Sequence, residues 1–127
     1  MPLATAPWVS ILGLAVCAFA QDDRQIPLAC NLKAIPALER PHYNELMKRL
    51  RAAVQERRQI PRGYAFRLDG KTIGLREVGE WMSMERLCCP FFSFQLSAAA
   101  QDEHWVLSLT GPTGVEALIE EEFPARH

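Results

Sequence analysis

The sequence lacks an excess of charge of either sign. Its 14 Lys and Arg residues are balanced by 15 Asp and Glu residues, which gives a formal net charge of -1. General nucleic-acid binders instead carry strongly basic surfaces. The apolar fraction of 49% is too high for the disordered class. The composition therefore predicts a folded protein that has no nucleic-acid partner.

The sequence also lacks internal repeats, low-complexity linkers and common catalytic motifs. It contains no Ser-His-Asp grouping and no recognisable pair of catalytic carboxylates. The Gly-Pro-Thr-Gly run at residues 111–114 lacks the lysine and the spacing of a phosphate-binding loop, and predicts a tight turn instead. These absences leave enzyme activity undecided and favour a non-catalytic protein.

An apolar run at residues 8–17 has the length of a signal-peptide core, although no Lys or Arg precedes it. Ala18-Phe19-Ala20 and the polar residues that follow complete an Ala-x-Ala cleavage pattern. We therefore predict a signal peptide over residues 1–20, a periplasmic or secreted location, and a single domain over residues 21–127. Because the run is shorter than the roughly 20 apolar residues of a membrane span, no stable span is expected after cleavage.

Cysteines are few, and their number is informative. Cys17 falls within the predicted signal peptide, so the mature protein would keep Cys30, Cys88 and Cys89. An odd number of cysteines in an oxidising compartment cannot pair completely. At least one thiol is therefore expected to be free, bound to a metal ion or shared between molecules.

Apolar residues recur every three or four positions in three segments, which predicts three helices at residues 41–57, 75–87 and about 115–123. The last of these contains the acidic run at residues 120–122, which is expected to be a solvated face. These helices would each place one apolar stripe on a common core.

Alternation of apolar and polar residues predicts the strands. Asp69-Gly70 is a typical hairpin signal, so we expect a short return strand after it. The predicted extended segments are residues 26–32, 64–68, 71–73, 91–97 and 105–110. Together with the helices they predict a small single α+β domain, in which about three helices pack on an antiparallel sheet of about four or five short strands.

The Glu-Arg-Leu-Cys-Cys-Pro-Phe stretch at residues 85–91 ends the second predicted helix. Neighbouring residues of a regular helix point about 100° apart, but Pro90 disfavours helical conformation at Cys89. Both sulfurs can then turn towards a common site, where Cys30 on an adjacent strand would supply a third. Glu85 replaces an apolar residue in the buried stripe of the same helix, just before the thiols.

Sulfur-only sites favour soft ions such as Cu(I) or Hg(II), and accept Zn(II) with a fourth ligand. The candidates for this fourth ligand are Glu85, His42 and His104. The residues therefore predict a site for a soft metal ion or a thiophilic compound, with Cys30, Cys88, Cys89 and Glu85 as its members.

Two other interpretations fit the same cysteines. In a thiol-disulfide redox protein, Cys30 would pair with Cys88 or Cys89, and the remaining thiol would attack the bridge. The helix C-terminus opposes the thiolate that this attack needs. In a non-catalytic domain, a structural Cys30 disulfide would stabilise the fold by about 2–4 kcal/mol, and the third cysteine would simply be buried.

Three motifs of the chain resemble those of a group of small, largely uncharacterised bacterial proteins. The group shares Ala-Cys-x-Leu, Glu-Arg-x-Cys-Cys-Pro-Phe and Leu-x-Gly-Pro-x-Gly, which match residues 29–32, 85–91 and 109–114. The resemblance implies a link to heavy-metal resistance, and it implies that the shared polar centre consists of Cys30, Glu85, Cys88 and Cys89. The chain departs from the group in its predicted signal peptide and in its Asp69-Gly70 turn.

Overall fold

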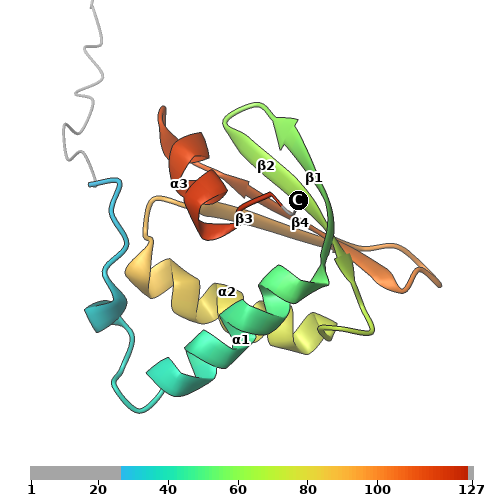
Figure 1. The fold of residues 1–127 in the computed structure, drawn as a ribbon, viewed down its shortest axis with the longest axis horizontal. Helices are drawn as coiled ribbons and strands as arrows, with labels where there is room; N and C mark the ends of the chain where they lie inside the picture. The colour runs from blue at the N-terminus through green and yellow to red at the C-terminus, as the bar shows by residue number, and fades with distance from the viewer. Residues whose placement is uncertain (1–26, 126–127) are drawn as a thin grey trace, which may run out of the picture.

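The computed structural model describes residues 27–125, which form a small α+β domain (Figure 1). Its three α-helices accompany a four-stranded antiparallel sheet with the strand order β1-β2-β4-β3. In chain order the elements are the 3-10 helix η1 (Leu32–Ala34), α1 (Arg40–Ala53), β1 (Val54–Ile60), β2 (Gly63–Asp69), α2 (Leu75–Cys88), β3 (Ser93–Ala98), β4 (His104–Thr110) and α3 (Val115–Glu122). The predicted fold class is confirmed.

The N-terminal part of the chain is only partly described. The predicted signal peptide over residues 1–20, with Cys17, lies outside the described residues. The predicted extended segment at residues 26–32 is described from residue 27 and pairs with no strand. It passes the C-terminal end of α2 instead, where the Asn31 N–H donates to the Cys88 carbonyl at 2.8 Å. Within residues 27–125, no helix combines the length and the apolar character of a membrane span.

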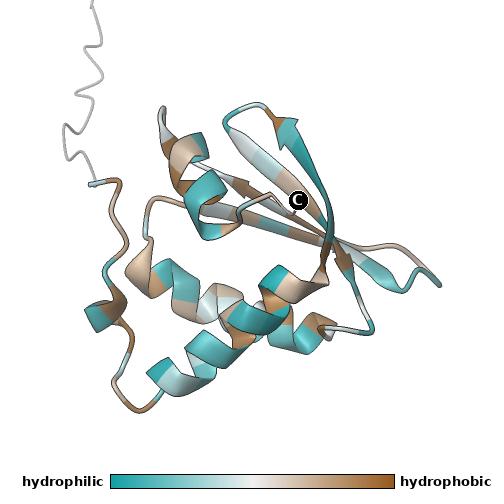
Figure 2. Cartoon of the chain, in the orientation of Figure 1, coloured by the Kyte–Doolittle hydropathy of each residue, from teal (hydrophilic) through white to brown (hydrophobic). Residues whose placement is uncertain are grey.

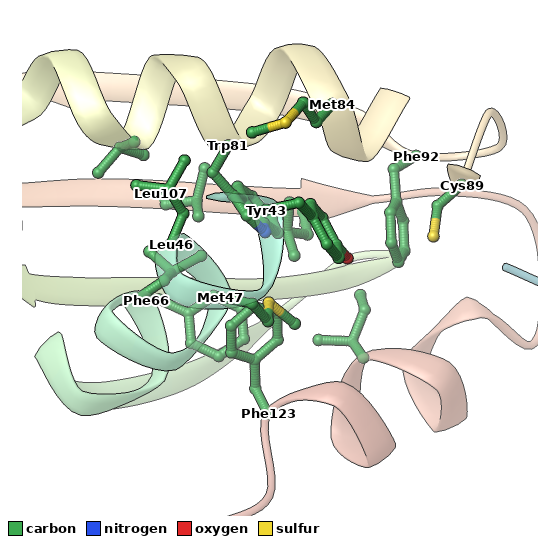
Figure 3. Close-up of a cluster of buried hydrophobic side chains, with 14 of the residues drawn as sticks. Tyr43, Leu46, Met47, Phe66, Trp81, Met84, Cys89, Phe92, Leu107 and Phe123 are labelled. Atoms are coloured by element: carbon green, nitrogen blue, oxygen red, sulfur yellow. The ribbon is translucent and has the colours of Figure 1, made fainter. Parts of the chain in front are cut away.

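The hydrophobic core lies between the sheet and the helices (Figure 3). Phe66 of β2 and Leu107 of β4 are opposite each other in the sheet, and both are buried. Phe123, which follows α3, packs its ring 4.8 Å from that of Phe66 and 6.1 Å from that of Trp81 on α2. Because the same ring contacts β2 and α2, the closing helix α3 and the helix α2 share one core.

The helices α1 and α2 are amphipathic, and their ribbons alternate between hydrophilic and hydrophobic residues (Figure 2). Arg49 on α1 bonds the Glu77 carboxylate of α2, with Nη2 2.9 Å from Oε1. The same carboxylate accepts the Gly74 N–H at 3.0 Å, at the start of α2. The predicted stripe of α1 is confirmed as its buried face, which consists of Tyr43, Leu46, Met47, Leu50 and Ala53.

The first predicted helix ends too late. The helix α1 stops at Ala53, and residues 54–60 form β1, an edge strand that pairs with β2. Most side chains of β1 are exposed, so its sequence shows little alternation and continues the polar face of the helix. Hydrogen bonding to β2 outweighs the local helix preference of these residues. The other predicted helices and the strands at residues 64–68, 91–97 and 105–110 are confirmed to within two residues.

The predicted hairpin at Asp69-Gly70 is wrong, because residues 71–73 form no strand and the chain turns into α2. The Asp69 carboxylate accepts from the Lys71 N–H at 3.0 Å and from the Thr72 hydroxyl at 2.9 Å, which ends β2 in an Asx-type turn. A Cβ at Gly70 would lie 2.2 Å from the Glu103 carbonyl oxygen. Glycine at this position therefore allows a close backbone approach rather than a two-residue hairpin.

Two glycine-to-alanine substitutions should have opposite effects on stability. A Cβ at Gly79, in the exposed middle of α2, would meet nothing within 4 Å. We expect Gly79→Ala to stabilise the protein by about 0.5–1 kcal/mol through helix propensity. A Cβ at Gly63 would lie 1.8 Å from the Leu109 carbonyl oxygen, so Gly63→Ala should destabilise by more than about 1 kcal/mol. Urea denaturation measures both changes, and an unaffected Gly63→Ala protein would contradict the close approach of β2 and β4.

Candidate functional site

The two adjacent cysteines lie where α2 ends. Cys88 is the last helical residue, and Cys89 is the C-cap, with a φ of -126° and a ψ of 69°. The Cys89 N–H still donates to the Glu85 carbonyl at 2.7 Å, and Pro90 follows. This break brings the Cys88 and Cys89 Sγ atoms to 3.5 Å from each other. The predicted end of the helix at the cysteine pair is therefore confirmed.

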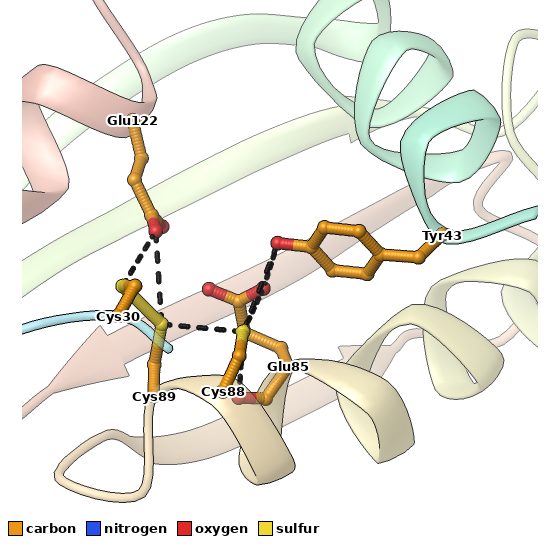
Figure 4. Close-up of a disulfide and its surroundings, with 6 residues drawn as sticks. All are labelled: Cys30, Tyr43, Glu85, Cys88, Cys89 and Glu122. Atoms are coloured by element: carbon orange, nitrogen blue, oxygen red, sulfur yellow. Dashed lines mark hydrogen bonds between the residues drawn. A yellow bond between two sulfur atoms is a disulfide. The ribbon is translucent and has the colours of Figure 1, made fainter. Parts of the chain in front are cut away.

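Cys30 forms a disulfide bond with Cys89, which lies 59 positions further along the chain (Figure 4). Their Cα atoms are 4.8 Å apart, a separation typical of disulfides. Cys88 is the free cysteine of the described residues and is fully buried. The structure thus brings the three predicted sulfurs to one place, where two of them are bonded to each other.

Glu85 lies in the core next to these sulfurs, with a solvent exposure of 0%. The Tyr43 hydroxyl of α1 donates to its Oε2 atom at 2.6 Å. The Cys88 Sγ atom lies 3.6 Å from the same oxygen. The other oxygen, Oε1, has no hydrogen-bond partner within the described part of the chain. Tyr43 is a member of the site that the sequence pattern assigned only to the buried stripe of its helix.

Glu122, the last residue of α3, is a second member that the sequence pattern did not indicate. The prediction that residues 120–122 form a solvated face is wrong for Glu122, because its Oε1 atom lies 3.1 Å from the Cys30 Sγ and 3.7 Å from the Cys89 Sγ. Its Oε2 atom is buried and unpartnered in residues 27–125. Sulfurs in a disulfide carry no proton, so these are contacts, whereas the two thiols formed by reduction would be donors facing this carboxylate.

The donor atoms of Cys30, Glu85, Cys89 and Glu122 all lie within 4.8 Å of one another. They come from the N-terminal segment, from α2 and its C-cap, and from α3 (Figure 4). The Glu85 and Glu122 carboxyls are close enough to hydrogen bond to each other when one of them is protonated. We call these four residues, with Cys88 and Tyr43, the thiol-carboxyl cluster.

Burial raises the pKa of four acids in this cluster. Desolvation raises the pKa of Glu85, and desolvation together with the Glu85 charge raises the pKa of Glu122 to about 8. The same two causes raise the pKa of the Cys88 thiol to about 12 and raise the pKa of the Tyr43 hydroxyl above its ordinary value. Near neutral pH the raised pKa values therefore favour the protonated carboxyls of Glu85 and Glu122, which would be ionised in water.

Neither predicted histidine ligand lies in the cluster. The His42 Nε2 atom is 2.8 Å from the Glu80 carboxylate, and the His104 Nδ1 atom is 3.1 Å from the Asp102 carboxylate. Both pairs are partly exposed. Of the three candidates for the fourth ligand, only Glu85 therefore lies in the cluster, and the Glu122 carboxylate lies beside the sulfurs as well.

No protein-family model matches the chain, and no curated protein or solved structure matches it either. The chemistry must be inferred from the geometry of the cluster. Its sulfur and carboxylate atoms are suited to coordination of a cation, and a thiol beside a disulfide is suited to exchange between them.

Reduction of the Cys30–Cys89 bond should lower the free energy of unfolding by about 2–4 kcal/mol, because the bond closes a long loop in the unfolded chain. Urea denaturation with and without a dithiol measures this difference. The Cys30→Ser variant should lose the response to the dithiol, whereas the Cys88→Ser variant should keep it. A response of full size in Cys30→Ser would contradict the pairing.

The protein should become less stable as the pH rises from about 5 to about 8. The pKa of Glu122 is raised from 4.5 to about 8 in the folded protein, so between these values the folded state holds a proton that the unfolded state has lost. This stabilisation is complete below the ordinary pKa and disappears as the pH passes the folded pKa. The raised pKa of Glu85 acts in the same direction.

Urea denaturation of the oxidised protein at both ends of this range tests the effect. Glu122→Gln should reduce the loss of stability by at least about 1.4 kcal/mol, the equivalent of one pKa unit. Glu121→Gln, at the exposed neighbouring position, should change it much less, because the Glu121 charge is only a minor cause of the raised Glu122 pKa. The lowered pKa values of Asp69 and Asp102 affect stability only in more acidic solution. Equal pH slopes in Glu122→Gln and the parent would contradict a proton held at Glu122.

Proposed function

We propose that this protein binds a soft metal ion or a thiophilic compound outside the cytoplasm, through the reduced form of the thiol-carboxyl cluster. The observation that carries the proposal is the convergence of Cys30, Glu85, Cys89 and Glu122, whose donor atoms lie within 4.8 Å of one another. Cys88, with its sulfur 3.5 Å from that of Cys89, would supply a third thiolate. Donors from separate elements that meet at the edge of the core support a built binding site.

The carboxyl groups give a reason to prefer a cation over a purely structural disulfide. Glu85 Oε1 and Glu122 Oε2 are buried, and neither has a hydrogen-bond partner in the described residues. A proton held by one carboxyl lets the two hydrogen bond to each other. Two ionised carboxylates buried side by side are costly, and a bound cation offsets that cost by replacing the proton. A disulfide that served only as a clasp would need neither these carboxyls nor the thiol of Cys88.

The donor set narrows the choice of ion. Thiolates alone favour Cu(I) or Hg(II), whereas thiolates combined with a carboxylate also suit Zn(II). We infer that Cys30, Cys88 and Cys89 are the soft ligands, and that Glu85 or Glu122 completes the site when the ion accepts oxygen. The shared motif residues of the bacterial group named above coincide with Cys30, Glu85, Cys88 and Cys89, which supports a role in binding heavy metals.

Binding requires reduction of the Cys30–Cys89 bond, because the thiolate is the form of cysteine that binds metals. A dithiol supplies the two electrons and two protons for this reduction and becomes a disulfide itself. A location outside the cytoplasm is supported by the disulfide and by the predicted signal peptide over residues 1–20, since disulfides persist in oxidising compartments.

Metal titration of the reduced protein tests this proposal. In a Cys17→Ser background every remaining thiol belongs to the cluster. Under anaerobic conditions and against a competing chelator, we expect uptake of one equivalent of Cu(I), Hg(II) or Zn(II), because the four donor groups converge at one point and the Cys88 sulfur lies beside that of Cys89. Oxidised protein should bind at least tenfold more weakly, which corresponds to about 1.4 kcal/mol. Reduced protein that takes up none of the three ions would rule out the metal site.

Matched variants assign the ligands in the same titration. Cys89→Ser should weaken the binding of all three ions, because it removes the central sulfur. Glu122→Gln should weaken Zn(II) more than Cu(I), since Zn(II) accepts carboxylate oxygen more readily. Glu121→Gln is the control on the exposed side of the same helix and should bind like the parent. Equal losses in Glu121→Gln and Glu122→Gln would contradict a ligand role for Glu122.

A further inference from the structure

Cys88 is a buried thiol that lies against the disulfide without being part of it. Its Sγ atom is 3.5 Å from the Cys89 Sγ, and it is equally far from the Glu85 carbonyl oxygen. The Cys89 sulfur thus has a bonded partner, Cys30, and a second sulfur next to it (Figure 4). Thiol-disulfide exchange requires an attacking sulfur beside the sulfur under attack, and Cys88 meets this requirement of proximity.

We propose that Cys88 exchanges with the Cys30–Cys89 disulfide inside the protein and releases Cys30 as a surface thiol. The Cys88 sulfur attacks the Cys89 sulfur, a Cys88–Cys89 bond forms, and the Cys30–Cys89 bond breaks. The proton lost by Cys88 ends on Cys30, and the number of disulfides stays the same. The step therefore needs no outside oxidant or reductant.

The surroundings provide one carboxyl group at each end of this exchange, where Glu85 accepts the proton of the attacking thiol and Glu122 donates a proton to the leaving sulfur. Glu85 Oε2 lies 3.6 Å from the attacking Cys88 sulfur. Glu122 Oε1 lies 3.1 Å from the sulfur of Cys30, which leaves. Because the two carboxyls belong to one cluster of donor atoms, a proton can pass between the two ends without entering bulk water.

The exchange moves the free thiol from the core to the surface. Cys88 and Cys89 have a solvent exposure of 0%, whereas Cys30 belongs to the exposed N-terminal segment. In the exchanged form Cys30 is accessible to a disulfide in solution, which it can attack to form a mixed disulfide. The activity that follows is thiol-disulfide exchange with an external disulfide. Cys30 is the residue that reacts with this disulfide, while Cys88 and Cys89 stay joined by their own disulfide in the core.

The Cys30–Cys89 form should dominate at equilibrium, in agreement with the structure. A bridge between adjacent residues departs from preferred disulfide geometry, and such strain makes a disulfide easier to break. Burial also raises the pKa of the Cys88 thiol, which slows the attack. We expect exchange over minutes to hours, the usual range for uncatalysed disulfide rearrangement.

Alkylation of the native, oxidised protein tests the exchange without any metal ion, so its outcome is independent of the metal-binding proposal. The Cys17→Ser protein is treated with iodoacetamide, quenched with acid and digested with trypsin without reduction. Trypsin separates residues 25–33, which contain Cys30, from residues 87–126, which contain both other cysteines.

We expect one alkyl group per chain, at least tenfold more of it on Cys30 than on Cys88, and the two peptides unlinked. Alkylation of Cys88 with the peptides still linked would overturn the proposal, because Cys88 would then react with iodoacetamide directly, without exchanging with the disulfide. The proposal would also be overturned if no cysteine of the native protein were alkylated over hours and labelling occurred only after denaturation. Contaminating reduced protein is recognised by its three alkyl groups.

A variant with the free thiol moved elsewhere is the matched control. Cys88→Ser combined with Ser97→Cys keeps one free thiol but places it at an exposed position of β3. Its label should fall on the introduced residue while residues 25–33 and 87–126 stay linked. Separation of these peptides in the control at the rate of the parent would show exchange between molecules and would overturn the internal step.

Discussion

The Tyr43 hydroxyl donates to Glu85 at 2.6 Å inside the core, and this hydrogen bond joins α1 to α2 beside the cysteines. It satisfies one oxygen of a carboxyl group whose solvent exposure is 0%. The other oxygen has no hydrogen-bond partner in residues 27–125 unless a proton is shared with the Glu122 carboxyl. Burial, together with a charge on Glu85, raises the pKa of Glu122 and Cys88 in turn. The cluster is therefore kept close to neutral by protons, and any cation that enters must displace them.

The Cys30–Cys89 bond determines which chemistry this arrangement allows. While the bond is intact, it ties the N-terminal segment to the end of α2 and presents a disulfide to the Cys88 thiol. After reduction, the same sulfurs become donors that face Glu122 and turn into potential metal ligands once they lose their protons. The two activities that we propose, redox exchange and metal binding, thus depend on the oxidation state of the same cysteines. In these proposals the buried carboxyls transfer protons in the exchange and are ligands in metal binding.

Residue patterns predicted the parts of the fold whose buried faces are long and apolar, such as α1 and the pair β3 and β4. They missed β1, because an edge strand with exposed side chains shows little alternation. The close approach of the Cys88 and Cys89 sulfurs was predictable from the sequence, because Pro90 ends the helix at this pair. The position of Glu122 beside the disulfide was not predictable from the sequence, because it results from packing against Cys30, which is 92 positions away in the chain. Tyr43 fitted the apolar stripe of α1, and a stripe gives no information about the partner of a buried hydroxyl.

The number of protons released when the reduced protein binds Zn(II) tests the exchange of protons for a cation most directly. Calorimetry in buffers of different ionisation enthalpy gives this number. Ordinary thiols are protonated near pH 7, and burial raises the pKa of Cys88 and Glu122 further. Binding at that pH should therefore release about three protons or more per ion. Release of fewer than about one proton per bound ion would contradict this, because the ligands would then have been ionised before the ion arrived.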